Sequence, residues 1–218
     1  MRSIAPLLVL VGCSTLSGAR PLEPGQHAVG ATVGGVLVPL GPIPLPNVNV
    51  EAKHGLVTIA DRPLDLNYGL NVTGLPFGIV QGHIGNSFLL FDQAKARPAL
   101  SLTKRLFLAT NAAGASNRVT SRVQGWALDQ IELTASWKPG HQLVYVGVAE
   151  YIDWGQPSLL ITPSVGAQLD PGEEGGFLVQ PELRWYGVGR TTDADNIDWV
   201  GPTGALGFSL GFATRFGG

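Results

Sequence analysis

Apolar and polar residues alternate along most of this chain, and the alternation repeats every two residues. It is clearest between Leu64 and Gly74, where apolar side chains share one face and polar or small side chains share the other. The apolar set is Leu64, Leu66, Tyr68, Leu70 and Val72, and the other set is Asp65, Asn67, Gly69, Asn71 and Thr73. Because successive side chains of a β-strand point to opposite faces, this pattern predicts a strand with one apolar and one polar face.

The same alternation, interrupted by clusters of Gly, Pro, Asn and Asp, divides the chain into about ten predicted strands. These span residues 26–38, 47–60, 64–75, 78–91, 99–111, 121–137, 141–154, 158–169, 176–190 and 199–216. Most exceed the usual strand of a soluble sheet and match the about 9–11 residues of a tilted membrane strand. The predicted fold class is therefore all-β, an antiparallel up-and-down transmembrane β-barrel of about ten strands (8–10) over residues 25–218.

The amino-acid composition limits where the apolar residues of such a barrel can lie. Charged residues make up 14% of the chain, whereas about 25% is typical of a soluble domain. Beyond the N-terminus no apolar run approaches the about 18 residues of a membrane helix. The apolar residues must therefore fill a large core or face lipid. The net charge of −2 gives no reason to expect binding to nucleic acid.

The N-terminus has the layout of a secretory signal peptide. Arg2 is followed by the apolar run Ile4–Val11, then by Gly12 and by Cys13, the only cysteine. The run is too short to span a bilayer and suits the apolar region of an export signal. This order of residues places a small-residue cleavage site directly before the cysteine.

The motif Leu10-Val11-Gly12-Cys13 resembles the cleavage site of bacterial lipoproteins. The resemblance implies that residues 1–12 are removed and that Cys13 carries a covalent lipid with acyl chains such as palmitate. Residues 13–24 would then be the lipidated cysteine and a linker. Ser14, rather than Asp, after the cysteine implies that the lipoprotein sorting machinery delivers the protein to the outer membrane.

The loop lengths agree with an outer-membrane orientation. A periplasmic N-terminus and an even number of strands return the C-terminus to the periplasmic side. The loops after odd strands would then be external, and they include the long segments 39–46, 112–120 and 191–197. Tight turns are expected at 61–63 and 138–140 on the other side. Short periplasmic turns and longer outer loops are typical of outer-membrane barrels.

Aromatic residues cluster near the predicted strand ends, as in the girdles of membrane barrels. Trp154 and Trp199 fall near the outer ends, and Phe91, Trp137 and Phe216 fall near the inner ends. The final alternating segment, residues 207–216, resembles the C-terminal strand that the barrel assembly machinery recognises, except that two glycines follow its last aromatic residue. The chain as a whole resembles the general class of bacterial outer-membrane β-barrels.

The polar faces carry charges that need partners if they point into a narrow barrel. These candidate lumen residues are Glu51, Asp65, His83, Arg105, Glu132, Glu182 and Arg184, with Lys53 beside them. They could form an ion-pair network that plugs the lumen or a selectivity ring in a small pore. Because ten strands lie near the closed end of the barrel size range, the plug is favoured. Lys104, next to Arg105, must then face outward.

The sequence offers little evidence of catalysis. His83 could act as a base in a lipid-modifying barrel enzyme, but no Ser lies two residues after it, and a hydrogen-bonded lumen histidine is the favoured interpretation. The histidines lack the spacing of metal ligands, and nucleophile-elbow and nucleotide-binding motifs are absent. We therefore expect no catalytic residue, no metal and no cofactor apart from the lipid on Cys13. A lipid-modifying enzyme remains as a distant alternative.

The preferred hypothesis is a lipid-anchored outer-membrane β-barrel with a structural or surface-interaction role. Its expected partners are outer-membrane lipid and the sorting and assembly machineries; the sequence identifies no external partner. One alternative is a narrow transport pore. Another is a lipid-tethered periplasmic β-barrel or sandwich that holds an apolar ligand inside. The facing of strand 64–75 separates these hypotheses, because the last one requires Leu66 and Leu70 inside and Asn67 outside.

Overall fold

The computed structural model describes residues 18–36, 47–111, 126–153, 159–170, 176–188 and 204–218. The proposed signal and lipidation residues, Leu10 to Cys13, lie outside this part of the chain, as do Trp154, Trp199 and the predicted outer loops. The described part contains ten strands: β1 (His27–Val36), β2 (Asn47–Ile59), β3 (Arg62–Asn71), β4 (Ile79–Phe91), β5 (Ala99–Asn111), β6 (Trp126–Trp137), β7 (Leu143–Asp153), β8 (Leu159–Gln168), β9 (Phe177–Tyr186) and β10 (Ala205–Phe216). A short 3-10 helix, η1 (Leu75–Phe77), precedes β4, and no described helix is long and apolar enough to cross a membrane.

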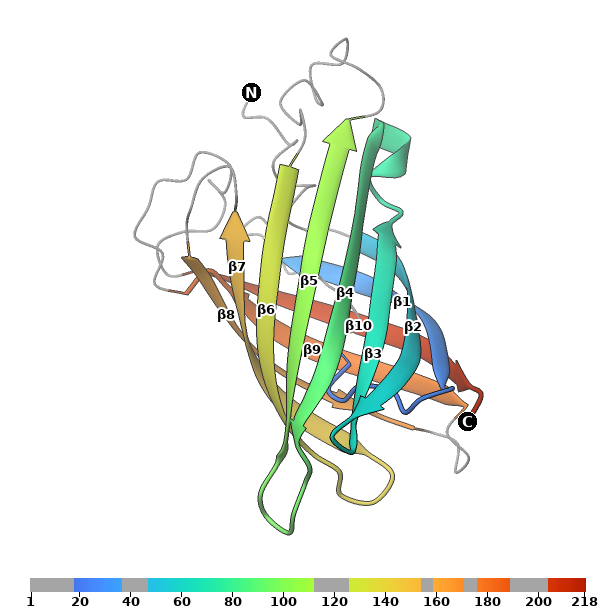
Figure 1. Ribbon diagram of the computed structural model, residues 1–218. Helices are drawn as coiled ribbons and strands as arrows, with labels where there is room; N and C mark the ends of the chain where they lie inside the picture. Colours follow the sequence, from blue (N-terminus) through green and yellow to red (C-terminus); the bar gives the residue numbers. More distant parts are fainter. Residues whose placement is uncertain (1–17, 37–46, 112–125, 154–158, 171–175, 189–203) are drawn as a thin grey trace.

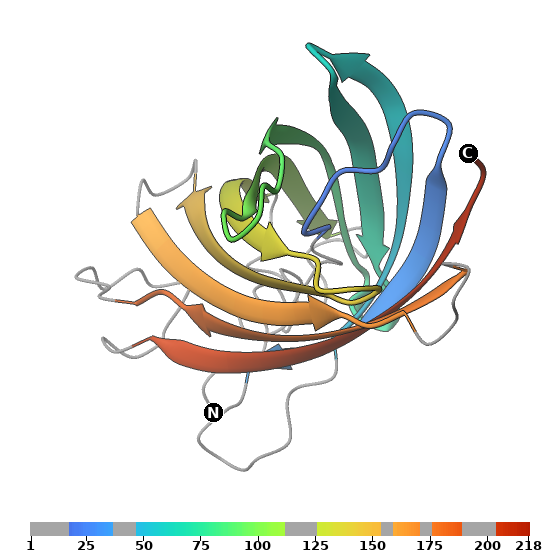
Figure 2. The ribbon, with the colours of Figure 1, turned by 90° about the horizontal axis from the view of Figure 1, so that it is seen from below.

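The ten strands form one closed antiparallel barrel (Figures 1 and 2). Each strand pairs with its neighbours in the chain, and β1 pairs with β10 to close the ring. His27 stands opposite Phe216 in that last pairing, so the chain enters and leaves the barrel at the same end. The predicted ten-strand up-and-down architecture is confirmed.

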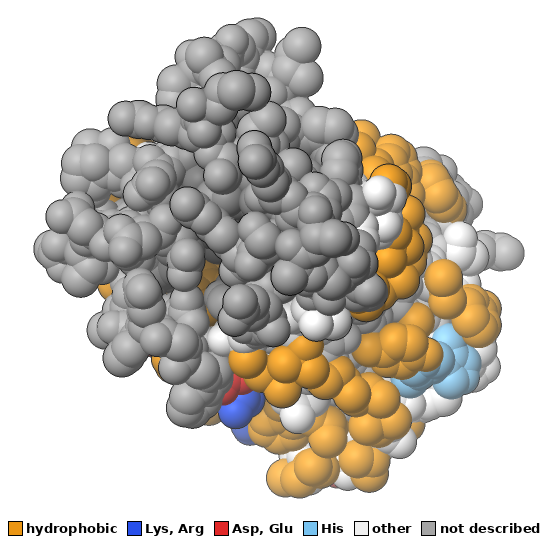
Figure 3. Space-filling view, turned by 90° about the horizontal axis from the view of Figure 1, so that it is seen from above, with side chains coloured by type: hydrophobic (Ala, Val, Ile, Leu, Met, Phe, Trp, Pro, Cys, Tyr) orange, Lys and Arg blue, Asp and Glu red, His pale blue; other side chains and the backbone are white. Residues whose placement is uncertain are grey.

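The barrel turns its polar face inward and its apolar face outward. On β3 the side chain of Asn67 is completely buried, whereas Tyr68 is 43% exposed. The hypothesis of an apolar ligand inside a periplasmic barrel is therefore wrong, because Tyr68 and Leu70 point away from the lumen. The part of the outer wall that is visible in Figure 3 is accordingly largely apolar. Its exposed side chains include Val29, Val33, Val50, Leu70, Ile84, Leu102, Leu108, Ile131, Leu133, Val146, Val148, Ile161, Val165, Leu183, Trp185, Leu206, Phe208 and Phe212.

The turn between β2 and β3 consists of two residues. Ala60 and Asp61 both have positive φ angles, 50° and 61°, as the tight hairpin turn that matches strand twist requires. Because this turn needs only two residues, β3 begins at Arg62 and includes Pro63, which the sequence had suggested as part of the turn. Pro63 pairs with Thr58 close to the strand's start, where proline is tolerated.

The three aromatic residues that the sequence places together at one end of the barrel do share one end. Phe91, Trp137 and Phe216 are the last residues of β4, β6 and β10, at the end of the barrel that also carries the turn between β2 and β3 (Figure 1). The indole N–H of Trp137 donates a hydrogen bond of 3.0 Å to the carbonyl of Ala96 in the adjoining turn. Figure 1 shows this end at the bottom, and we call it the floor of the barrel.

The seam between β8 and β9 is the least complete in the described barrel. Leu169 and Val179 exchange two backbone hydrogen bonds, of 2.8 and 2.9 Å, and continuing their register places Pro181 opposite Ala167. Proline has no N–H, so Pro181 cannot donate a hydrogen bond to β8. Pro163 on β8 likewise cannot donate one to β9. Between the two prolines only three pairs remain: Ser164↔Arg184, Val165↔Leu183 and Gly166↔Glu182.

We predict that Pro181→Val strengthens this seam. The new N–H would face the carbonyl of Ala167 and add a hydrogen bond worth about 1 kcal/mol. Amide hydrogen exchange in β8 and β9 should slow, and the unfolding midpoint should rise. Pro139→Val, in the exposed turn between β6 and β7, is the matched control and should leave exchange at the seam unchanged. Equal effects of the two substitutions would contradict this account of the seam.

Candidate functional site: the polar lumen

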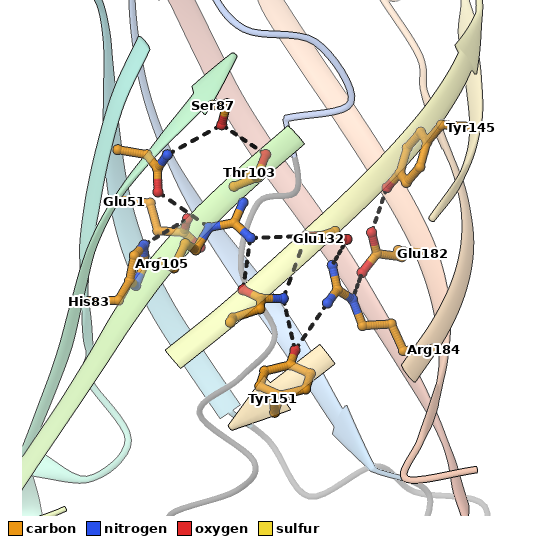
Figure 4. A network of polar contacts seen from close by, with 12 residues as sticks. Glu51, His83, Ser87, Thr103, Arg105, Glu132, Tyr145, Tyr151, Glu182 and Arg184 are labelled. Atoms are coloured by element: carbon orange, nitrogen blue, oxygen red, sulfur yellow. Dashed lines mark hydrogen bonds and ion pairs between the residues drawn. The ribbon is translucent and has the colours of Figure 1, made fainter. Parts of the chain in front are cut away.

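The centre of the lumen is an ion-pair network around Glu132 on β6. Its carboxylate accepts a hydrogen bond of 3.0 Å from Arg105 Nη1 on β5 and another of 3.0 Å from Arg184 Nη2 on β9. Arg184 also donates a hydrogen bond through Nε to Glu182, which lies two residues earlier on β9. Figure 4 shows the two guanidinium groups approaching the Glu132 carboxylate from opposite sides. One carboxylate thus joins side chains from β5, β6 and β9 across the barrel.

Hydroxyl and amide groups extend the network around this centre (Figure 4). Tyr151 OH on β7 accepts hydrogen bonds from Gln130 Nε2 (3.0 Å) and Arg184 Nη1 (3.2 Å). Tyr145 OH donates to Glu182 Oε2 at 2.7 Å. Toward the other wall, Arg105 Nε donates to the Asn67 amide oxygen on β3. The network therefore runs from β3 to β9 around more than half of the barrel.

Burial makes this network sensitive to the loss of any one charge. The side chains of Arg105, Glu132, Glu182 and Arg184 are each no more than 2% exposed. Charges removed from water are tolerated only when opposite charges and hydrogen bonds compensate them. Here Glu132 faces two arginines and Glu182 faces one, so the two positive and two negative charges balance. The alternating pattern that faces these side chains inward thus also requires them to pair.

The remaining candidate residues lie on the opposite wall and form separate contacts. His83 Nε2 on β4 lies 3.6 Å from Glu51 Oε2 on β2, beyond normal hydrogen-bond distance. The other Glu51 oxygen accepts a hydrogen bond of 3.3 Å from Thr32. Asp65 Oδ2 accepts the backbone N–H of Leu22, at 3.1 Å. Asp65 therefore contacts the segment before β1, and Figure 4 shows His83 and Glu51 away from the Glu132 centre.

That segment, residues 18–26, crosses the floor of the barrel. Figure 2, which views the barrel from below, shows it running over the opening before it turns into β1. Ala19 is fully buried, and its carbonyl accepts a hydrogen bond of 3.2 Å from Ser101 on β5. Arg20 donates to Ser136 on β6 (3.0 Å) and to Gln93 (2.5 Å). The segment expected as a simple linker thus enters the barrel mouth; we call residues 18–26 the floor segment.

Two glycines allow the floor segment to lie so close to the wall. A Cβ atom on Gly55 of β2 would come within 1.9 Å of the Glu23 carbonyl oxygen. A Cβ atom on Gly18 would come within 1.8 Å of Lys53 Nζ, which lies buried in the lumen wall. Burial against the floor lowers the pKa of the Arg20 guanidinium, and the nearby Asp92 carboxylate partly opposes that effect. These contacts make the segment an integral cover of the barrel.

Two hollows lie beside the floor segment in the described barrel. The larger, about 290 Å³, is lined by residues that include Glu23, His141 and Arg215. The smaller, about 30 Å³, lies between the floor segment and the wall and is lined by residues that include Gly30, Lys53 and Gln180. That is about the volume of one water molecule in the liquid. Within the described residues, no three His, Cys, Asp or Glu side chains gather as metal ligands. The Glu132 network crosses the described lumen and the floor segment covers one mouth, an arrangement that favours a plug over an open channel.

Three residues that contribute to the lumen contacts, Arg20, Tyr145 and Tyr151, were not among the candidates predicted from the sequence. Tyr145 and Tyr151 share the lumen face of β7 with Gly147 and Ala149, and the opposite face carries Val144, Val146, Val148, Glu150 and Ile152. A contrast between aliphatic and small or hydroxyl-bearing positions is the signal that would have identified the inward tyrosines. The contacts of Arg20 had no such signal, because the floor segment has no alternating pattern.

Searches against known protein families and curated proteins find no match for the chain. The described fold has weak likeness to solved bacterial outer-membrane β-barrels, the class that the sequence resembles. The translocator domain of the autotransporter NalP from Neisseria meningitidis has a TM-score of 0.46 and 9% identity, over 89% of this chain and 90% of that chain. The N-terminal β-barrel domain of Pseudomonas aeruginosa OprF has a TM-score of 0.34 and 9% identity, over 89% and 100%. Ail, the attachment invasion locus protein of Yersinia pestis, has a TM-score of 0.28 and 10% identity, over 89% and 100%. We draw no functional argument from similarities of this size.

We predict that Glu132→Gln destabilises the barrel by about 3–5 kcal/mol, because it leaves two buried guanidinium groups without their shared carboxylate. The free energy of unfolding in denaturant, measured on the folded protein in micelles, tests this. Glu23→Gln makes the same chemical change at an exposed position of the floor segment and should cost no more than about 0.5 kcal/mol. A cost for Glu132→Gln as small as for the control would contradict the central place of Glu132.

Proposed function

We propose that this protein is an outer-membrane β-barrel whose apolar outer wall contacts lipid. The observation that carries the proposal is the facing of the strands, with charged and amide side chains inside and aliphatic and aromatic side chains outside. In water this arrangement would expose most of the apolar surface, whereas lipid removes that cost. A closed barrel also leaves no unpaired strand edge, which a bilayer core does not tolerate.

The barrel's role in this proposal is structural or to present its outer loops, rather than transport. The Glu132 network crosses the described lumen and the floor segment covers one mouth, so a dissolved solute meets two barriers. A narrow pore would need both barriers to move. The balanced charges of the network favour a fixed plug over a selectivity ring, because a ring presents unpaired charges of one sign.

A lipid on Cys13 would provide a second attachment. Gly18 lies at the floor, beside Lys53, and Cys13 precedes it by five residues, which reach about 17 Å when extended. His27 and Phe216 are paired at the floor, so a membrane surface on that side is within reach of both chain ends. A lipid on Cys13 in the inner leaflet of the outer membrane would make this the periplasmic side, for both termini.

The position of His83 supports a role without catalysis. Its ring lies inside the barrel against Phe107, at a centroid distance of 5.3 Å, and not on the outer wall where a lipid substrate would lie. We therefore propose that the protein is not an enzyme and requires no metal or cofactor. The partners that this proposal implies are outer-membrane lipid and the sorting and assembly machineries.

The membrane-barrel proposal predicts two results for the detergent-extracted protein. The unheated protein should migrate differently from the heated protein in gel electrophoresis, because a barrel stays folded in the detergent until it is boiled. In planar bilayers it should produce no stepwise conductance, because the lumen is occluded. Identical migration before and after heating would contradict the barrel in lipid, and regular channel steps from the native chain would contradict the plug.

The lipid anchor is tested separately with Cys13→Ser. The substitution should abolish incorporation of labelled fatty acid, because it removes the thiol that carries the lipid. The barrel should still fractionate with the outer membrane and keep its heat-dependent migration, because the apolar wall holds it there. Unchanged labelling would refute the lipidation site, and loss of the protein to the soluble fraction would show that the lipid is its only anchor.

A further inference from the structure

A polar patch interrupts the apolar outer wall on β4 to β7. The outward Lys104 side chain is 60% exposed and lies 3.8 Å from the Asp129 carboxylate on β6, whose side chain is 11% exposed. Asn86 on β4 pairs with Lys104 and is also exposed. Glu150 on β7 is half-buried in the same region. We call Asn86, Lys104, Asp129 and Glu150 the wall patch.

The wall patch lies well inside the strands rather than at their ends. Lys104 is the sixth of the thirteen residues of β5, and Glu150 is the eighth of the eleven residues of β7. An outward Lys costs about 2–4 kcal/mol at the bilayer midplane, and the cost falls to about 0–1 kcal/mol at the interfaces. The long Lys104 stem can direct its ammonium toward Asp129, which lies nearer the upper end of its strand. If the wall patch faces lipid, its charges therefore lower the stability of the barrel in the membrane.

The charges in the wall patch are not matched within one chain. Lys104 has Asp129 as its partner, but in the described part of the chain Glu150 has no salt bridge or side-chain hydrogen bond. Burying an unpaired carboxylate in an apolar environment is costly. A contact that brings a second cation to Glu150 would relieve that cost.

The register arranges these charges in a way that suits a second copy. Lys104, Ile131 and Glu150 are direct neighbours across β5, β6 and β7, with the apolar Ile131 between the cation and the anion. Two barrels inserted in the same direction are related by a two-fold axis along the membrane normal. When such an axis passes beside Ile131, β5 of each copy faces β7 of the other. Each Lys104 then faces the other copy's Glu150.

We propose that the wall patch is a dimer interface in the membrane, with a second copy of this chain as the occupant. Ile131 lies at the axis, and two Lys104–Glu150 pairs form on either side of it. Asp129 stays with Lys104 of its own chain, so each ammonium has two carboxylates around it. Charge complementarity across the axis carries this inference. The inference rests on the proposed membrane insertion and goes beyond it.

A mixture of two charge-reversed chains tests the contact. Lys104→Glu leaves a chain with acidic side chains at both positions 104 and 150. Glu150→Lys leaves a chain with basic side chains at both positions. Each variant alone should dimerise at least about tenfold less than the native chain, because its like charges face each other across the axis. The two variants mixed should recover dimers that contain one chain of each kind, since both contacts are then attractive.

The dimers are detected in lipid bilayers with a photo-crosslinking amino acid in place of Ile131, and with tags of different size on the two variants. Val33 on β1 is the control position, because it is equally outward-facing but five strands from β6 in the ring. Crosslinks between copies should form from position 131 and not from position 33. Heat-dependent migration of each variant, measured on the same samples, separates a lost contact from a lost fold or a failed insertion.

Each result decides the proposal in one direction. Recovery of mixed dimers from two variants that remain folded and inserted supports it. Equal dimerisation of the native chain and both variants, or no crosslink from position 131 in the folded native chain, overturns it. If Lys104→Glu fails to fold because it repels Asp129, Glu150→Lys alone remains decisive, since it leaves the Lys104–Asp129 pair intact. Failure of heat-dependent migration in the native chain would refute membrane insertion instead.

Discussion

The sharing of the Glu132 carboxylate between Arg105 and Arg184 is the interaction on which the rest of the structure depends. These side chains come from β5, β6 and β9 and are almost completely buried, so they hold distant parts of the ring in one register. Each of these charges has an opposite partner, which offsets the free-energy cost of burying charged side chains inside the barrel. With these charges paired inside, the alternate residues of the described strands form an apolar outer wall.

Two features of the described barrel depart from a uniform wall and a uniform ladder. The prolines at β8 and β9 leave a short ladder between these strands, while the wall patch places charges on β5 to β7. These features lie on neighbouring parts of the ring. The proposed pairing of two copies at the wall patch would give Glu150 an opposite charge that the described part of its own chain does not supply.

Much of the fold could be predicted from the sequence, because a period of two determines both the strands and their facing. The alternation in β3 correctly separated Asn67 from Tyr68, and the sequence of Lys104 and Arg105 correctly required one to face outward. The pairing of Arg105 with Glu132, rather than with Glu51 or Asp65, depends on register and strand tilt, which alternation does not determine. The floor segment was not predicted because two of its contacts use the backbone of Ala19 and Leu22, and backbone groups carry no sequence signal. Its Arg20 contacts lie in a stretch without an alternating pattern.

The central claim is that the outer wall faces lipid while the polar face is shielded inside. Spin labels at four successive positions of β10, Phe208 to Gly211, test it directly in bilayers, because the two facings alternate there. Labels at Phe208 and Leu210 should collide frequently with oxygen, which concentrates in lipid, and labels at Ser209 and Gly211 should be shielded from it. Labels at Phe208 and Leu210 that collide instead with a water-soluble nickel reagent would contradict the account.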